Sequence, residues 1–353
     1  MAKFSQQVLK WYRHAGRHDL PWQQNPTAYR VWISEIMLQQ TQVSTVIPYY
    51  TRFMQAFPDV DSLAAADVDA VLHLWTGLGY YARARNMHKA AKTICQEFDS
   101  ELPSDLDGLI SLPGIGRSTA GAILSLSADQ SVAILDGNVK RVLARYHQVE
   151  GWPGNKAVEN KLWQIAEQYT PKKNAGEYTQ AIMDLGATLC TRSRPQCDNC
   201  PVKSGCQAEK HALQHLYPGK KPKKTLPVRQ TVFAILENAD GEILLEKRPP
   251  SGVWGGLWGF PEYDKENELI DWLASDRGYV TDLSSQHAVV RHTFSHFHLD
   301  ITPVKLRLVS TKNRIEDKSE EYWYKPDGGM KLGMAAPVKK LIDGLFSTAA
   351  GES

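Results

Sequence analysis

Hydrophobic residues follow two different periods along the chain. From Met1 to about Leu216 they recur every three or four positions, as in Tyr29–Val43 and Trp163–Tyr169, which is typical of amphipathic helices. From about Val228 onward the apolar runs become short and are separated by turn residues, which favours β-strands. The pattern therefore predicts an all-α N-terminal region followed by a C-terminal region of mixed α and β structure.

The second region also offers individual elements. Its first two strand candidates flank an Asp240-Gly241 pair, which is a strong signal for a tight hairpin turn. Strands are expected at Thr231–Leu236, Glu242–Glu246, Ala288–Phe294, Ile301–Val309 and Tyr322–Tyr324, and helices at Lys265–Ala274 and Pro337–Phe346. The sequence YPGKKPKKTLP, rich in Pro and Lys, predicts a linker over residues 217–227. We thus expect a helical region over residues 1–216 and a second domain over residues 228–350.

Composition and charge exclude little by themselves. A chain of 353 residues suits two or three domains, and a net charge of +2 does not identify a partner. Between Cys190 and Thr225 the sequence contains eight Lys or Arg residues and only two acidic residues. A polyanion could bind to such a basic segment, although a solvated basic linker would have the same composition. The N-terminal residues lack the apolar core of an export signal, and no segment has the length of a membrane span. We therefore expect a protein of the reducing cytosol, where clustered cysteines are more often metal ligands than disulfides.

Four of the five cysteines form a compact C-x6-C-x2-C-x5-C quartet: Cys190, Cys197, Cys200 and Cys206. Thiolates are soft ligands that suit zinc or an iron–sulfur cluster, and the spacing alone leaves both open. The loop between the first two cysteines carries Arg192 and Arg194, which could contact phosphate groups if a metal held both ends of the loop. Cys95 stands apart in a helical stretch, and we interpret it as a small buried hydrophobic residue.

A second candidate binding element is the sequence LPGIG at Leu112–Gly116, between helix candidates at Leu106–Ser111 and Arg117–Leu126. Gly114 and Gly116 permit a tight turn, and they let backbone N–H groups at the start of the second helix approach a phosphate oxygen. Glycine is common in turns between helices, so this motif alone is a weak signal for phosphate binding. The cysteine quartet downstream strengthens that interpretation.

Two carboxylates are candidates for catalysis. Glu35 lies among mostly apolar neighbours on a predicted helix, where desolvation would raise its pKa and keep it partly protonated. Asp136 ends the apolar run Val132–Leu135 and precedes a predicted helix start, so an ordinary N-cap is the alternative to a catalytic role.

The motifs WISEIMLQQTQV, GLGYYARAR, LPGIGRSTA and ILDGNVKRV, together with the cysteine quartet, resemble those of the MutY family of adenine DNA glycosylases over nearly the whole chain. The resemblance implies a helix-hairpin-helix glycosylase core, with a six-helix barrel at about residues 23–132 and an iron–sulfur subdomain of residues 1–22 and 133–216 that holds a [4Fe–4S] cluster on the four cysteines. It also implies that Glu35 is the general acid that protonates adenine N7 and then helps to activate water, while Asp136 stabilises the cationic sugar. The substrate would be adenine paired with 8-oxoguanine or guanine in double-stranded DNA. The enzyme would be a cytoplasmic monomer associated with a bacterial nucleoid, with no membrane partner.

Further site residues follow from the same resemblance. Tyr80 matches a residue beside the base opposite adenine, and Gln40 matches a wedge in the duplex. Asn138 matches a polar neighbour of the sugar and its water, and Gln180 matches a contact to the adenine edge. The expected DNA contacts are Gln40, Gly114, Gly116, Arg117, Ser118, Arg192 and Arg194.

One position separates two related chemistries. Endonuclease III carries a lysine there, whose amine forms a Schiff base and cuts the DNA backbone, whereas this chain has Ser118. A hydroxyl cannot form an imine, so the resemblance favours a monofunctional, hydrolytic glycosylase. The alternatives are an endonuclease III-like enzyme specific for pyrimidines and a noncatalytic iron–sulfur protein that binds DNA and needs neither Glu35 nor Asp136.

The C-terminal region resembles a Nudix domain that lacks its catalytic box. Arg248–Pro250 and Trp254–Glu262 resemble the segment leading into a Nudix box, but nothing between Glu262 and Gly278 supplies the paired glutamates that hold divalent metal. We therefore expect an α+β, Nudix-like recognition domain. Its triplet Phe294, Ser295 and His296 matches the family's loop for reading 8-oxoguanine, and the nearby histidines lack the carboxylates of a metal site.

Overall fold

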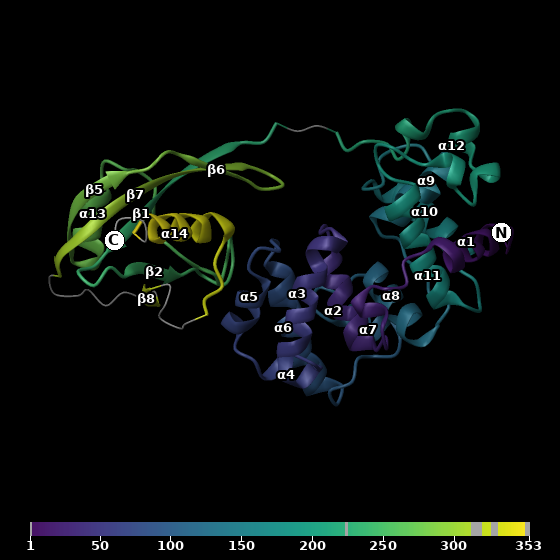
Figure 1. Cartoon of the computed structure of the whole chain (residues 1–353), viewed down its shortest axis with the longest axis horizontal. Coiled ribbons are helices and arrows are strands. Elements are labelled where there is room, and N and C mark those ends of the chain that lie inside the picture. The colour runs from purple at the N-terminus through teal and green to yellow at the C-terminus, as the bar shows by residue number, and fades with distance from the viewer. Residues whose placement is uncertain (1, 223–224, 312–319, 326–330, 350–353) are drawn as a thin grey trace. The chain divides into compact units, whose positions relative to one another are not determined.

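The computed structural model describes residues 2–222, 225–311, 320–325 and 331–349, and it divides into two compact units (Figure 1). One unit contains Met1–Ala65 and Asn86–Lys223, and the other contains Ala66–Arg85 and Lys224–Ser353. A stretch of the N-terminal region thus clusters with the C-terminal strands. The linear domain boundaries expected from the sequence stay a prediction.

The first unit is helical, with no strand among its described residues. Its helices are α1 (Ala2–Ala15), α2 (Ala28–Leu38), α3 (Val43–Ala56), α4 (Val60–Ala65), α7 (Leu106–Ser111), α8 (Arg117–Ala128), α9 (Gly137–His147), α10 (Lys156–Tyr169), α11 (Ala175–Asp184) and α12 (Gln207–Lys210). Short 3₁₀ or π-helical turns lie at Pro21–Gln23, Leu185–Leu189, Cys197–Asn199, Lys203–Gly205 and Gln214–Leu216. Helix α6 (Ala82–Glu97) begins in the second unit and continues in the first. The all-α prediction for the N-terminal region is confirmed.

A hydrophobic core joins α1 to the helices that follow the hairpin. Phe4 and Val8 of α1 are buried there together with Leu143, Leu162 and Ile182. Each such side chain stabilises the fold by about 1.5 to 3 kcal/mol relative to an exposed one. Elsewhere in the unit α2 packs against α3 and α8, which brings the helix that carries Glu35 next to the second helix of the hairpin.

The helical period between Tyr29 and Val43 spans nearly the whole of one helix and the start of the next. Helix α2 ends at Leu38, and α3 begins at Val43. Between them Gln40 has a φ of 57°, a left-handed conformation that an α-helix cannot contain. The apolar spacing runs across this break because both helices contribute to the same core.

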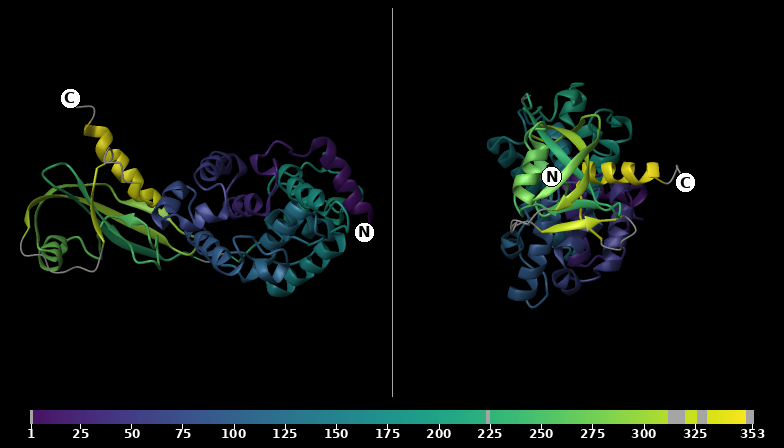
Figure 2. Two further views of the ribbon diagram at one scale, coloured as in Figure 1. Left: turned by 90° about the horizontal axis from the view of Figure 1, so that it is seen from below. Right: turned by 90° about the vertical axis from the view of Figure 1, so that its left-hand side faces the viewer.

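The second unit is built on one mixed β-sheet. Its strands are β1 (Val228–Glu237), β2 (Ile243–Lys247), β3 (Trp258–Gly259), β4 (Glu262–Tyr263), β5 (Tyr279–Gln286), β6 (Val290–Thr293), β7 (His298–Thr311) and β8 (Glu321–Tyr324), and its helices are α5 (Val68–Trp75), α13 (Leu269–Arg277) and α14 (Ala336–Ala349). The main path is β3-β2-β1-β7-β5, and β4, β6 and β8 pair with β1, β7 and β2, respectively. The pairing of β1 with β7 is parallel, whereas the other strand pairs are antiparallel. Figure 2 shows the helical first unit and the strands of the second from two further sides.

All five expected strands are present, as β1, β2, β6, β7 and β8. Val232, Leu236, Leu244 and Leu306 are buried in the core of the sheet, and the predicted turn before β2 has Gly241 at a φ of 74°. Strand β5 was not predicted, because its outer half, Leu283–Gln286, is exposed and shows no hydrophobic alternation. No helix among the described residues is long and apolar enough to cross a membrane.

Candidate active site and recognition pocket

Glu35 lies on α2 between two buried residues, Ser34 and Ile36. Burial and, to a smaller extent, the negative charge of Asp136 together raise the pKa of its carboxyl group from an ordinary value of 4.5 to about 8. The group is therefore protonated at neutral pH, as a general acid must be. Helix α2, which carries Glu35, packs on α8, and Ser118 of α8 bonds to the residue before Asp136, so the segments that carry the two carboxylates meet at α8.

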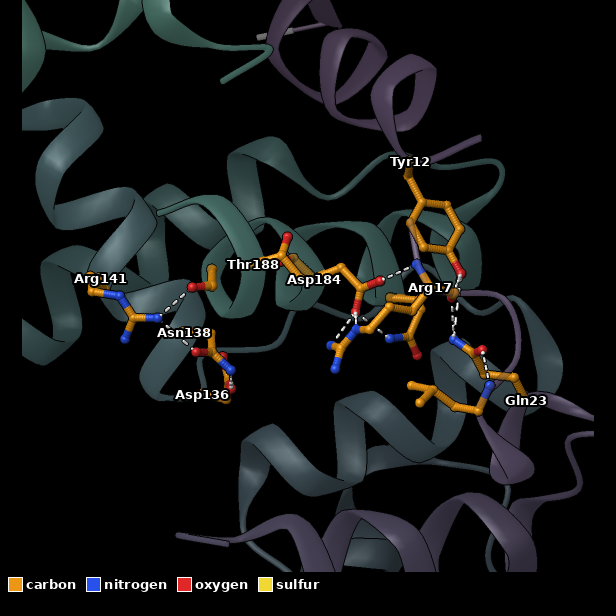
Figure 3. A network of polar contacts seen from close by, with 11 residues as sticks. Tyr12, Arg17, Gln23, Asp136, Asn138, Arg141, Asp184 and Thr188 are labelled. Carbon is orange, nitrogen blue, oxygen red and sulfur yellow. Dashed lines mark hydrogen bonds and ion pairs between the residues drawn. The ribbon is translucent and has the colours of Figure 1, made fainter. Parts of the chain in front are cut away.

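Asp136 is the N-cap of α9, as the alternative interpretation held. Its Oδ1 accepts a hydrogen bond from the backbone N–H of Val139 at 2.7 Å. Its Oδ2 accepts one from Asn138 Nδ2 at 3.1 Å (Figure 3). Burial raises the pKa of Asp136, and the hydrogen bonds from Val139 and Asn138 oppose that rise. The cap does not compete with catalysis, since it fixes the orientation of a carboxylate that still influences Glu35.

Arg141 links this carboxylate pair to the cysteine loop. Its guanidinium donates to Asn138 Oδ1 at 2.8 Å (Figure 3). It also donates to the carbonyl oxygen of Gly186 at 2.7 Å and to that of Cys190 at 2.6 Å. The sequence analysis missed Arg141, although it stands in the ILDGNVKRV motif three residues after Asn138. That spacing places the two side chains on one side of a helix.

Gln180 belongs to a second polar network, which is drawn in Figure 3. It is buried on α11, and its Nε2 donates to Asp184 Oδ1 at 3.0 Å. Asp184 is fully buried and also accepts from the backbone N–H of Arg17 at 2.8 Å and from its guanidinium. The network fixes the amide of Gln180, while the expected contact with adenine stays a prediction. Sequence reasoning missed both Arg17 and Asp184, which lie 167 residues apart.

The hairpin has the geometry expected of a phosphate-binding turn. Gly114 has a φ of 83°, and Gly116 is the N-cap of α8 with no side chain capping the helix. A Cβ on Gly116 would meet nothing within 4 Å, so the backbone there is open to a ligand. Next to it, Arg117 pairs with Glu167 and lies over the Trp163 ring, 4.0 Å from its centroid.

Ser118 faces the segment that precedes Asp136. Its Oγ accepts a hydrogen bond from the backbone N–H of Leu135 at 3.0 Å. The hydroxyl therefore supports the chain next to the catalytic candidate, and it adds no amine to the site.

The four cysteines line one small pocket. Among the described residues, no three His, Cys, Asp or Glu side chains already stand in a metal-holding arrangement. The donor set nevertheless fits a soft metal centre, since four free thiols face the same space and Arg145 donates to Cys190 Sγ at 3.3 Å. In the loop between the first two cysteines, Arg192 and Arg194 are exposed, while their carbonyl oxygens accept hydrogen bonds from Arg145 and Thr191.

A larger pocket, of about 710 Å³, lies within the second unit. Its lining includes Gly77–Ala82, Arg85, Gly252–Trp254, His292–His296 and Ala336. Tyr80 is 52% exposed and has a φ of 49°, so the turn presents its ring outward. The pocket brings Tyr80 together with all three residues of the predicted reading loop. Gln40, another predicted DNA contact, is exposed on the first unit.

The reading loop forms the tip of the hairpin between β6 and β7. The backbone N–H of Phe294 donates to the carbonyl oxygen of Phe297 at 2.9 Å, and their rings stack at 4.5 Å. Trp254 also packs on Phe294, with ring centroids 5.3 Å apart. Ser295 and His296 remain exposed, so a rigid aromatic base presents two polar side chains. The sequence analysis did not identify Trp254 as a residue that lines this pocket and packs on the loop.

Comparison with known proteins decides the family. Sequence models of two families match the chain: HhH-GPD superfamily base excision DNA repair protein over residues 33–168, and NUDIX domain over residues 232–344. An adenine DNA glycosylase of Buchnera aphidicola subsp. Schizaphis graminum is 42% identical over 340 residues, which cover 96% of this chain and 98% of that protein. The chain belongs to the adenine DNA glycosylase family. The family member of Mus musculus is 34% identical over 364 residues and matches 86% of this chain and 70% of its own.

As a member of the adenine DNA glycosylase family, the chain is a DNA N-glycosylase, which is a hydrolase. Two solved structures resemble it: a thermostable thymine-DNA glycosylase (TM-score 0.52, 23% identity, 59% of this chain and 95% of that one) and a non-covalent endonuclease III–DNA complex (TM-score 0.51, 21% identity, 60% and 95%). The similarity to these two structures shows the fold of the helical region. The NUDIX match covers residues 232–344, which belong to the second unit. The predicted fold class, a helix-hairpin-helix core with a Nudix-like domain, is confirmed.

Proposed function

We propose that this chain hydrolyses the N-glycosidic bond of adenine that lies opposite 8-oxoguanine or guanine in duplex DNA. The observation that carries the proposal is the carboxylate pair, in which burial and the charge of Asp136 raise the pKa of Glu35 to about 8, and α8 contacts the segments of both residues. Cleavage of an N-glycosidic bond needs an acid for the departing base and a negative charge for the sugar cation. The pair supplies both.

The reaction begins once adenine has left the base stack. The Glu35 carboxyl group donates its proton to adenine N7, and the bond between N9 and C1′ breaks with its electrons moving to the base. The carboxylate of Asp136 stabilises the positive charge on the sugar, in an orientation fixed by Asn138 and Val139. Water then bonds to C1′ and gives its proton to the Glu35 carboxylate, which restores the acid. Gln180, held by Asp184, contacts the adenine edge.

The same site is hydrolytic only. A lyase needs an amine that attacks C1′, and Ser118 supplies a hydroxyl that already accepts a hydrogen bond from the chain before Asp136. We therefore assign a monofunctional mechanism.

DNA binding rests on backbone groups and on a few exposed side chains. The open start of α8 at Gly116, with the neighbouring Arg117, suits a phosphate, and Arg192 and Arg194 suit further phosphates. Gln40, exposed at the break between α2 and α3, is the wedge. A monomer acting on chromosomal DNA in a bacterial cytoplasm fits these contacts.

The second unit reads the base opposite adenine. Oxidation turns guanine N7 from an acceptor into a donor and adds an acceptor at O8, so a group that both donates and accepts can detect it. A serine hydroxyl does both, and Ser295 is exposed beside His296 on the hairpin tip. Phe294 shapes the loop, and Tyr80 contacts the base from the same pocket.

We assign a [4Fe–4S] cluster to the four cysteines, whose sulfurs would hold it. Such a cluster would cross-link the loop that carries Arg192 and Arg194. The test is iron analysis of the purified protein, where about four iron atoms per chain and broad absorbance near about 400 nm are expected. Stoichiometric zinc without colour would overturn the assignment.

The decisive experiment incubates purified protein with duplexes that contain A:8-oxoguanine, A:G, A:C or an oxidised pyrimidine, followed by alkaline cleavage. Excision of adenine from the first two duplexes, with no strand cutting before alkali, is expected. Cutting at the oxidised pyrimidine would favour an endonuclease III-like activity, and binding without excision would favour a noncatalytic protein.

A further inference from the structure

Asp69 makes a partly buried ion pair inside the second unit. It lies in the first turn of α5, and its Oδ2 accepts hydrogen bonds from Lys247 Nζ at 3.0 Å and from Trp258 Nε1 at 3.3 Å. The side chains of Asp69 and Lys247 are only 17% and 24% exposed, so solvent screens the pair less than a surface ion pair. One carboxylate thus joins α5 to strands β2 and β3.

The rest of the segment 66–85 is attached to the same unit at several further points. His73 Nδ1 is 3.2 Å from the carbonyl oxygen of Leu332, and the Tyr81 hydroxyl donates to the carbonyl oxygen of Met334 at 2.8 Å. Gly333 lies so close to α5 that a Cβ there would come within 2.6 Å of Leu72 Cβ. The segment therefore docks along its length on the C-terminal residues.

This attachment continues to the reading loop. Arg85 donates to the carbonyl oxygen of Gly255 at 2.6 Å, and the adjacent Trp254 packs on Phe294. At the other side of the pocket, Tyr80 stands on the turn that follows α5. The turn that carries Tyr80 and the tip that carries Ser295 are thus fixed to one body.

We propose that Asp69 is a positioning residue for substrate specificity: its ion pair with Lys247 holds the Tyr80 turn at the distance from the Ser295 tip at which both contact the same base. The proposal rests on the proposed function, because it assumes that this pocket reads the base opposite adenine. Asp69 belongs to the second unit and the carboxylate pair to the first, so its loss should change discrimination and leave the chemistry intact.

The test compares Asp69→Asn with a matched control, Asp67→Asn. Both remove one negative charge from the start of α5, but Asp67 is exposed and its side chain accepts from the Asp69 backbone N–H, a cap that Asn preserves. Single-turnover excision is measured on A:8-oxoguanine and A:G duplexes. Asp69→Asn is expected to lower the preference for A:8-oxoguanine about fivefold, the effect of about 1 kcal/mol from a lost ion pair, with excision from A:G unchanged. Asp67→Asn should keep the full preference.

Two further measurements separate positioning from general destabilisation. Amide hydrogen exchange of residues 77–83 should quicken in Asp69→Asn and not in Asp67→Asn, because the turn loses its attachment. Combined with Ser295→Ala, the Asp69 substitution should add no further loss of preference. Equal losses on both duplexes, unchanged exchange, or full additivity with Ser295→Ala would each overturn the proposal. If the wild type excises adenine from both duplexes without a preference, the proposed reading of the opposite base by the second unit fails, whereas failure of the Asp69 role alone leaves the wild-type preference intact.

Discussion

The carboxylate pair of the first unit and the pocket of the second differ in how far their polar side chains are exposed to solvent. Glu35 lies in a largely buried helix, where loss of solvent raises its pKa, and Asp136 is fixed by backbone and side-chain hydrogen bonds. Ser295 and His296 instead stand exposed on a hairpin tip whose stiffness comes from stacked aromatic rings. In the proposed function, catalysis uses burial to set a protonation state, while recognition needs polar groups that are exposed to an incoming base.

This difference predicts that substitutions can change the proposed catalysis and the proposed base recognition independently of each other. Substitutions at the buried pair should change the rate of bond cleavage on every substrate. Substitutions at the exposed tip should change only the ratio between substrates. Effects that cross this division would break the comparison.

The largest effect is expected from Glu35→Gln. The amide keeps the shape of the side chain but cannot deliver a proton, so single-turnover excision should fall by about 10²- to 10⁴-fold on A:8-oxoguanine and A:G alike. Duplex binding, measured by fluorescence anisotropy, should be retained. Near-normal excision would remove Glu35 from the mechanism.

Asp136→Asn should lower the single-turnover excision rate by about 10²- to 10³-fold, because the sugar cation loses its counter-charge. Asparagine is as good an N-cap as aspartate, so the melting temperature should change little. The same change should move the alkaline fall in excision rate to lower pH, since the negative charge of Asp136 helps to raise the pKa of Glu35. A large drop in melting temperature with normal kinetics would reduce Asp136 to its capping role.

Replacing Ser295 and His296 together with alanine should lower the preference for A:8-oxoguanine over A:G by roughly 1 to 3 kcal/mol, the range for a lost specific base contact. Excision from A:G should change little, because both carboxylates remain. A parallel loss on the two duplexes would mean that the tip supports general affinity and does not read the base.

The last effect concerns the dependence of stability on pH. The folded-state pKa of Glu35, about 8, lies above its ordinary value of 4.5, so the stability that its protonated form provides is complete below about pH 4.5 and is lost as the pH rises through about 8. Because glutamine cannot ionise, the melting temperature of Glu35→Gln should exceed that of the wild type by an amount that grows between pH 5 and pH 8. A constant difference across this range would contradict the raised pKa.

Much of this architecture could be predicted from the sequence because it depends on local signals. The helical period, the Asp240-Gly241 turn and the apolar surroundings of Glu35 each involve neighbours within a few positions. The break at Gln40 escaped prediction because it is marked by a backbone dihedral and not by Gly or Pro.

The parts that escaped depend on partners far away in the sequence. Arg17 and Asp184 form a partly buried pair, yet no neighbouring residue in the sequence of either one indicates the other. The same holds for Asp69 with Lys247. No periodicity encodes such pairs, since they arise only when separate elements pack.

The assignment of α5 to the second unit has a consequence for synthesis of the chain. Trp258 follows Asp69 by 189 residues, and Met334 follows Tyr81 by 253. At about 5 to 20 residues per second, the ribosome adds these partners roughly 10 to 50 seconds after α5 has been made. During that interval the side of Leu72 that later meets Gly333 stays uncovered, so nascent chains stalled before residue 247 should bind chaperones through this helix, and chains extended past Met334 should not.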